Sequence, residues 1–232
     1  MNKALRMGSF AAECHGVRVP DSPFLHDRRI ARINSGNYES QEINGALHVV
    51  RPGDRVLELG AGLGIVGAVV ARNAQPSRVL SYEANPALIP HIRRLYRRNG
   101  LDDVISVRNA VLVGHGEDRK SLPFHVRSSY LGSSLIDVGR PAETVEVATE
   151  PLIEVMTELS PDVLIIDIEG GELDILRSAY LSAVRACVIE FHPEVYGREG
   201  MVACKTILRE AGLDRISDHS TRTVWTCERL AG

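Results

Sequence analysis

The chain has 232 residues, of which 44% are hydrophobic and 25% are charged, a composition typical of a globular protein with one large domain. A formal net charge of −3 argues against an extended phosphate-binding surface, so we expect no nucleic-acid partner. The sequence has neither the apolar core of a signal peptide nor a run of about 18 apolar residues, so we predict a cytoplasmic protein with no membrane partner.

The first 50 residues are predicted to form an N-terminal extension. Residues 1–38 contain short extended pieces separated by turns, and residues 39–50 have the composition of a helix that could act as a lid. Pro52 and Gly53 then interrupt the chain before the first apolar strand. We assign residues 51–232 to one α/β domain.

Strands and helices alternate through this domain. Apolar and β-type segments predict strands at 55–59, 78–83, 104–109, 162–168 and 185–191. Helical segments are predicted at 64–73, 86–98, 150–159, 172–183 and 200–211. Residues 111–148 are rich in glycine and proline breaks and are treated as an irregular or hairpin insertion. Closing strands at 213–217 and 222–228 complete a Rossmann-like, mostly parallel seven-stranded sheet with helices on both faces and a C-terminal antiparallel strand.

A glycine-rich turn follows the first strand of the domain and contains Gly60, Gly62 and Gly64. Glycines let a backbone approach a ligand closely, and the helix that follows offers free N–H groups at its start. Such a turn binds either a pyrophosphate or the amino-acid end of S-adenosylmethionine. The carboxylate of Glu58 would repel a pyrophosphate and attract the ammonium and sulfonium charges, so we predict S-adenosylmethionine as the cofactor, with NAD as the alternative.

The ends of the next two strands supply the predicted nucleoside contacts. Glu83 can accept hydrogen bonds from both ribose hydroxyls, and Asn85 follows it before the next helix. Asn109 and Ala110, at the end of the third strand, are predicted to meet the adenine. Glu83 is equally compatible with NAD, so it indicates a nucleoside without selecting the cofactor.

Three segments of the sequence resemble the FkbM family of methyltransferases. They are the glycine turn, the TyrGluAlaAsnPro segment at 82–86 and the AspIleGluGly segment at 167–170, within a match that covers about residues 35–195. Upstream, Tyr38 and Glu39 match the family's glycine–x–tyrosine–glutamate element, and we expect them to cover the donor, although Tyr38 could equally pack in the core.

This resemblance implies that residues 51–232 have a class I methyltransferase fold, that S-adenosylmethionine is the cofactor, and that sugars or other small molecules are methylated on a hydroxyl oxygen. The chain departs from the family at Ile165, where members usually carry a lysine. A contact made by that lysine is therefore missing or is supplied elsewhere.

The candidate catalytic groups lie at the ends of the fourth and fifth strands. Asp167 and Glu169 are two positions apart and share a face if the strand continues through them, and Glu190 and His192 have the same spacing on the next strand. We predict that His192 is the base that deprotonates the acceptor hydroxyl, because the ordinary pKa of imidazole is near neutrality. Asp167 would orient the donor or the substrate hydroxyl, with Glu169 beside it.

Other interpretations of these residues and of the chain stay open. His192 could cap the loop before Pro193, or the same side chains could hold a divalent cation, but the spacing is not diagnostic and we assign no metal. The sequence thus predicts an O-methyltransferase with a small-molecule hydroxyl acceptor. An NAD-dependent oxidoreductase and a methyltransferase acting on a macromolecule are the alternatives, and the sequence does not indicate an oligomeric state.

Overall fold

The computed structural model describes residues 9–126 and 143–229. Its N-terminal part is an antiparallel hairpin and two helices, namely β1 Phe10–Cys14, β2 Val17–Pro20, α1 Asp27–Asn34 and α2 Ser40–Val49. Helix α2 confirms the predicted helix at 39–50. The prediction of only extended pieces before it is wrong at α1, where the buried Ile33 packs into the core and the His26 side chain accepts a hydrogen bond from the N–H of Arg29 at the helix start.

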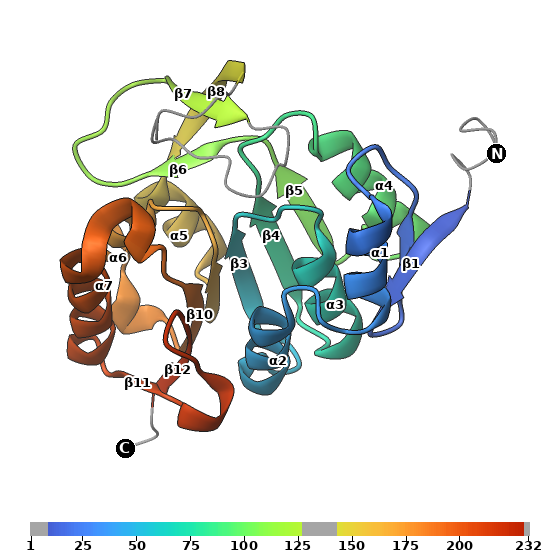
Figure 1. Cartoon of the computed structure of the whole chain (residues 1–232). Coiled ribbons are helices and arrows are strands. Elements are labelled where there is room, and N and C mark those ends of the chain that lie inside the picture. The colour runs from blue at the N-terminus through green and yellow to red at the C-terminus, as the bar shows by residue number, and fades with distance from the viewer. Residues whose placement is uncertain (1–8, 127–142, 230–232) are drawn as a thin grey trace.

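A seven-stranded sheet with the strand order β11-β12-β10-β9-β3-β4-β5 forms the centre of the molecule (Figure 1). Its strands are β3 Arg55–Leu59, β4 Arg78–Tyr82, β5 Ile105–Arg108, β9 Val163–Ile166, β10 Ala186–Glu190, β11 Leu213–Arg215 and β12 Val224–Arg229. Strand β12 is antiparallel to its neighbours β10 and β11, whereas β10, β9, β3, β4 and β5 pair in parallel. This arrangement confirms the predicted fold class.

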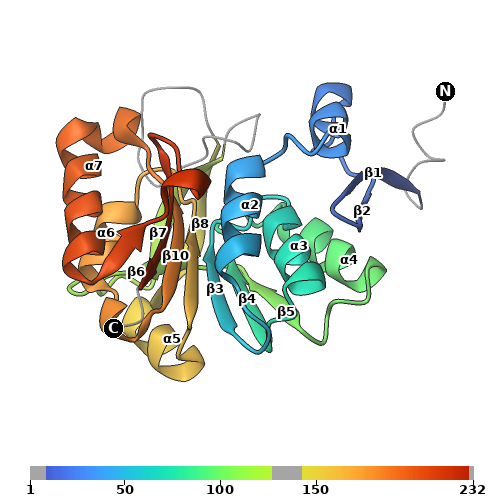
Figure 2. The ribbon, with the colours of Figure 1, turned by 90° about the horizontal axis from the view of Figure 1, so that it is seen from below.

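Helices cover both faces of the sheet (Figure 2). One face carries α2, α3 Ile65–Asn73 and α4 Ile89–Arg98, and the other carries α5 Leu152–Leu159, α6 Glu172–Ser178 and α7 Pro193–Glu210; the short 3₁₀ helices are η2 Leu181–Ala183 and η3 Ser217–His219. Alternate strand residues divide between the two cores, so Val56 packs with the first group of helices and Leu57 with the second. In the part of the chain that the structure describes, no helix combines the length and apolarity needed to cross a membrane.

Several element boundaries differ from the sequence prediction. Strand β9 ends at Ile166 rather than at residue 168, because the chain turns at Glu169 and Gly170, whose φ values are 54° and 118°. Helix α6 ends at Ser178, so residues 181–183 are a separate 3₁₀ turn. Helix α7 begins at Pro193 instead of residue 200 and is interrupted at Gly197, where φ is 77° and ψ is 172°.

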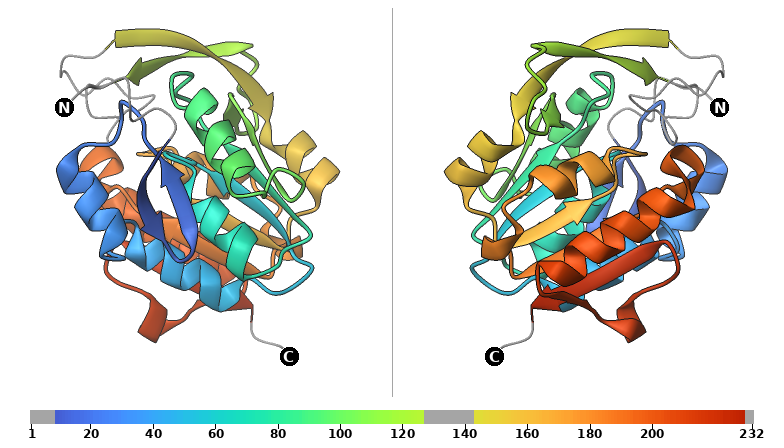
Figure 3. Two further views of the ribbon diagram at one scale, coloured as in Figure 1. Left: turned by 90° about the vertical axis from the view of Figure 1, so that its right-hand side faces the viewer. Right: turned by 90° about the vertical axis from the view of Figure 1, so that its left-hand side faces the viewer.

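The predicted insertion at 111–148 contributes a second, smaller sheet. Its strands are β6 Val111–Val113, β7 Ser121–Val126 and β8 Glu143–Pro151, with β8 parallel to β6 and antiparallel to β7. Residues 127–142 of the predicted insertion lie outside the described residues. Figure 3 shows this sheet beyond the end of the central sheet. Residues of β7 and residues at the carboxyl ends of β3 and β4 line one cavity.

Candidate functional site

The glycine turn after β3 is held tightly against the end of β9. Gly60 has a φ of 88°, and a Cβ at this position would lie 2.7 Å from the carbonyl carbon of Asp167 and still closer to its oxygen. The N–H groups of Gly60 and Ala61 both donate to the carbonyl of Tyr82, at 3.0 and 2.9 Å. Only glycine fits at position 60, so the turn closely joins the ends of three neighbouring strands.

The carboxylate of Glu83 organises the same turn from the end of β4. It accepts hydrogen bonds from the N–H of Gly62 and the N–H of Asn85, both at 2.7 Å and each on a different oxygen. Burial raises the pKa of Glu83 to about 7, although the backbone N–H groups oppose this shift. A carboxylate has about four acceptor positions, and these backbone N–H groups do not fill all of them. Glu83 is therefore both a support of the turn and an available acceptor for a ligand.

A cavity of about 360 Å³ opens between the glycine turn, the small sheet and the chain after β9. Its walls include half of the twelve predicted site residues, namely Gly60, Gly62, Glu83, Ala110, Asp167 and Glu169. Opposite them stand Leu122, Pro123 and Phe124 of β7. The cavity thus brings five of the ten predicted cofactor residues, Asp167 among them, and the predicted catalytic residue Glu169 together with apolar residues of β7.

Glu58 faces away from this cavity, toward α3. Its carboxylate is 1% exposed, accepts hydrogen bonds from the Ser81 hydroxyl and the Gly67 N–H, and has its pKa raised to about 7 by burial. These contacts do not favour the prediction that Glu58 contacts a cofactor. They indicate instead that Glu58 stabilises the start of α3. Gly64 is also outside the cavity lining, and a Cβ there would lie 2.8 Å from Ile92 of α4.

Three further predicted cofactor residues have supporting contacts beside the cavity. The Asn109 amide donates to the carbonyls of Glu83 and Ala84, at 2.8 and 3.0 Å, and so joins the ends of β4 and β5. The Asn85 side chain accepts from the N–H of Ala87 at 3.0 Å. Tyr38 is 4% exposed and belongs to the core that α2, α3 and α4 cover. None of the three is among the cavity-lining residues.

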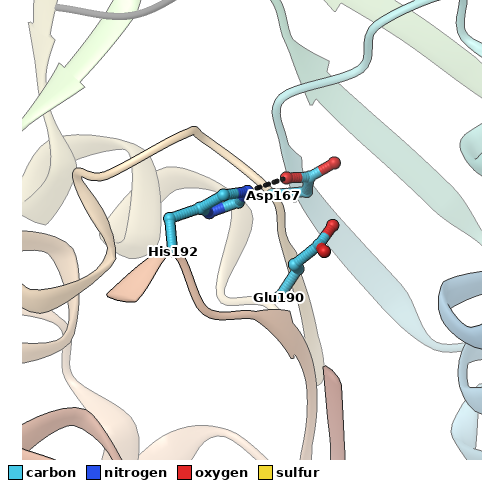
Figure 4. A group of neighbouring side chains, drawn as sticks. All are labelled: Asp167, Glu190 and His192. Carbon is cyan, nitrogen blue, oxygen red and sulfur yellow. Dashed lines mark ion pairs between the residues drawn. The ribbon is translucent and has the colours of Figure 1, made fainter. Parts of the chain in front are cut away.

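A histidine and several carboxylates meet at the ends of β9 and β10. Nε2 of His192 lies 3.6 Å from a carboxylate oxygen of Asp167 (Figure 4). The same nitrogen lies 3.6 Å from an oxygen of Glu169, and Nδ1 lies 2.6 Å from Glu172. The predicted neighbourhood of Asp167, Glu169 and His192 is confirmed, but not through a shared strand face. The chain leaves β9 at Ile166, and the turn that follows brings Glu169 back toward the imidazole.

The surroundings of His192 argue against its predicted role as a general base. Burial alone lowers the pKa of His192, but the hydrogen bond to Glu172 and the charges of Glu172, Asp167 and Glu169 outweigh burial and raise it to about 10. An imidazole with this pKa is already protonated at neutral pH and cannot accept a proton. His192 is also the N-cap residue of α7, although its side chain makes no capping hydrogen bond there.

Helix α2 and its N-cap residue bring two more carboxylates to this cluster: Glu39, which the sequence predicts to cover the donor, and Glu42, which the sequence prediction did not assign. Glu42 is buried, and carboxylate oxygens of Glu39, Glu42 and Glu190 lie within 4.8 Å of one another. Burial and, less strongly, the neighbouring carboxylates together raise the pKa of Glu39 and of Glu190 to about 7. The signal for Glu42 was its position three residues after Glu39, which places both on one side of the first helical turn.

Comparison with known proteins gives one family and a set of similar folds. Residues 60–213 match the family model described as the methyltransferase FkbM domain. No curated protein matches the chain.

Three solved structures illustrate the likeness of fold. A precorrin-6Y C5,15-methyltransferase from Geobacter metallireducens is 11% identical, with 84% of this chain and 88% of that one covered and a TM-score of 0.50. An uncharacterized protein from Listeria monocytogenes serotype 4b is 14% identical, with 82% of this chain and 67% of that one covered and a TM-score of 0.50. A putative tRNA (m1A22) methyltransferase from Streptococcus pneumoniae, in complex with S-adenosyl-L-methionine, is 13% identical, with 82% and 71% covered and a TM-score of 0.48.

Proposed function

This chain belongs to the methyltransferase FkbM family, and we propose that it transfers a methyl group from S-adenosylmethionine to a hydroxyl oxygen of a sugar or another small molecule. The family makes the chain a methyltransferase and S-adenosylmethionine its donor. The observation that carries the proposal for the acceptor is the position of Asp167 and Glu169. Both line the cavity beside the glycine turn, and one carboxylate oxygen of each lies 3.6 Å from Nε2 of His192.

The residues around the cavity fit the donor. Glu83 keeps acceptor sites for ribose hydroxyls while it holds the turn, and the neighbouring wall at Ala110 and Leu112 is apolar enough for an adenine. The methionine end of the donor carries an ammonium group. The negative charges of Asp167 and Glu169, which line the cavity beside the glycine turn, suit this group. Gly60 supports this fit because any side chain there would push the turn off Asp167.

The chemistry required of the protein is alignment and removal of one proton. The donor supplies a methyl carbon bonded to a positively charged sulfur. A lone pair of the hydroxyl oxygen forms the new C–O bond while the C–S bond breaks, and the electron pair of that bond stays on sulfur. The hydroxyl proton passes to a carboxylate, for which we propose Asp167, since it faces both the cavity and the cluster. Alignment of the reacting atoms can lower the barrier by about 7–11 kcal/mol.

The acceptor class follows from the opposite wall. Leu122, Pro123 and Phe124 of β7 contribute to the cavity lining, and Glu117 and Arg119, which also line it, form an ion pair. A molecule with an apolar body and several hydroxyls matches this combination better than a flat nucleic-acid base or an extended peptide.

The test is transfer of label from methyl-labelled S-adenosylmethionine to a panel of sugar and polyketide hydroxyl compounds, with NMR location of the new methyl group. We expect an O-methyl product and its loss in Asp167→Asn, with Glu199→Gln on the exposed side of α7 as the matched control. Label found only on nitrogen, on carbon or on a macromolecule would contradict the proposal. Reduction of added NAD by the same compounds would favour the oxidoreductase alternative.

A further inference from the structure

We propose that Asp167, Glu190 and His192 form a binding site for a hard divalent cation, with Mn²⁺ preferred over Mg²⁺. The role of this cation in methyl transfer rests on the proposed function, whereas its binding does not. The three side chains come from the ends of the adjacent parallel strands β9 and β10 and point toward one another (Figure 4).

The spacing of the three side chains fits one ion. One ligand atom from each of Asp167, Glu190 and His192 can be chosen so that all three lie within 4.8 Å of one another. Ligand atoms held at about 2.0–2.3 Å from one ion lie within about 4.6 Å of one another. Small rotations of the side chains therefore suffice to close the site, with no movement of the strands.

An orphaned oxygen points to a ligand that the protein itself does not provide. The Oδ1 atom of Asp167 is inaccessible to solvent, yet among the described residues it has no hydrogen-bond partner. Its nearest cationic neighbour is Nε2 of His192 at 3.6 Å, which is longer than a hydrogen bond. A buried carboxylate oxygen without a partner is costly, and a cation between Asp167 and His192 satisfies it.

His192 is oriented as metal-binding histidines are. Its Nδ1 lies 2.6 Å from the carboxylate of Glu172, which is fully buried at the start of α6, and this contact directs Nε2 toward Asp167. With Nδ1–H donating to a carboxylate, the neutral imidazole offers its Nε2 lone pair to a metal. Glu172 is thus a positioning residue for the proposed site.

The ligand chemistry selects the ion and its use. Two carboxylates favour hard cations, and the imidazole nitrogen shifts the preference from Mg²⁺ toward Mn²⁺. Asp167 also lines the cavity, so an ion bound to it can reach an acceptor hydroxyl there. A cation at that oxygen withdraws electron density and makes the proton easier to remove.

The site is tested by Mn²⁺ binding to the full chain in the absence of donor and acceptor. Bound Mn²⁺ loses its sharp EPR signal, so titration of the wild type should show one saturable site. We expect Glu190→Gln and His192→Asn to weaken binding at least tenfold and Glu172→Gln to weaken it about 10–100-fold. Glu199→Gln should leave Mn²⁺ binding unchanged, and thermal unfolding identifies any variant that has not folded.

The outcomes separate this proposal from the proposed function. If the wild type binds no Mn²⁺ at millimolar concentration, or if Glu190→Gln and His192→Asn bind it as the wild type does in a folded state, the cation site is overturned while methyl transfer stands. If Mn²⁺ binds with the expected variant pattern but no hydroxyl compound is methylated, the cation site stands and the proposed function fails.

Discussion

Replacing Gly60 by alanine tests whether the glycine turn must touch the end of β9. The added Cβ would overlap the carbonyl oxygen of Asp167 and lie 2.7 Å from its carbonyl carbon, whereas ordinary contacts begin at 3.4 Å, so the turn and β9 must separate by well over the about 0.7 Å that the carbon alone requires. Gly53 provides a matched control, because its φ is also 88° but a Cβ there meets nothing within 4 Å. Both alanine variants carry the same backbone strain, and only Gly60→Ala adds the clash.

The expected magnitudes follow from this pair. A left-handed backbone costs an L-residue about 1–2 kcal/mol, and overpacking a tight site costs about 1–3 kcal/mol more. We therefore expect Gly53→Ala to lower the free energy of unfolding by about 1–2 kcal/mol and Gly60→Ala by about 2–5 kcal/mol, measured by urea denaturation. Calorimetric titration with S-adenosylmethionine should show at least tenfold weaker binding only in Gly60→Ala. Equal stability of the two variants, with normal donor binding in both, would refute the reasoning.

Three further predictions concern single side chains. Glu83→Ala should weaken donor binding by about 1.5–3 kcal/mol for each ribose hydrogen bond lost, as measured by calorimetry, and unchanged affinity in a folded variant would remove Glu83 from the site. The pKa of Glu58 rises from 4.5 to about 7 on burial, so its protonated form stabilises the fold below pH 4.5 and this stability is lost as the pH rises through 7. The free energy of unfolding of the wild type should thus fall by about 3 kcal/mol relative to Glu58→Gln between pH 4.5 and 7, and parallel curves would contradict the shift. Phe124→Ala should raise the KM for the acceptor several-fold and spare donor affinity, whereas an effect on the donor alone would place the acceptor elsewhere.

The sequence was sufficient to predict the central sheet because its signals are local. Buried parallel strands are apolar on both faces, and the turn after β3 contains several glycines. Both features are recognisable within a few consecutive residues. Helix α1 was missed because arginines at positions 28, 29 and 32 surround its apolar residues, and because its start is capped by His26, a side chain that is uncommon in this role.

The candidate site was harder to predict because its contacts are long-range. The alternation along β3 already implies that Glu58 points away from Leu57 and Leu59, and applying it would have directed Glu58 toward α3 instead of the cavity. The raised pKa of His192 depends on Glu172, which approaches it only after the chain has turned at Glu169. Glu39 and Glu42 approach Glu190 across some 150 residues of sequence, a distance that no local pattern spans.

The position of β3 inside the sheet, between β9 and β4, also affects how the chain folds during synthesis. One neighbour, β4, follows within a few tens of residues, but the other pairs Val56 with Val163 and is made only after most of the chain has emerged. Contacts this distant in sequence slow folding, since a long loop must close before they form. A nascent or truncated chain that ends before residue 163 leaves β3 as an exposed edge of buried-type apolar residues, a surface prone to pairing with other chains.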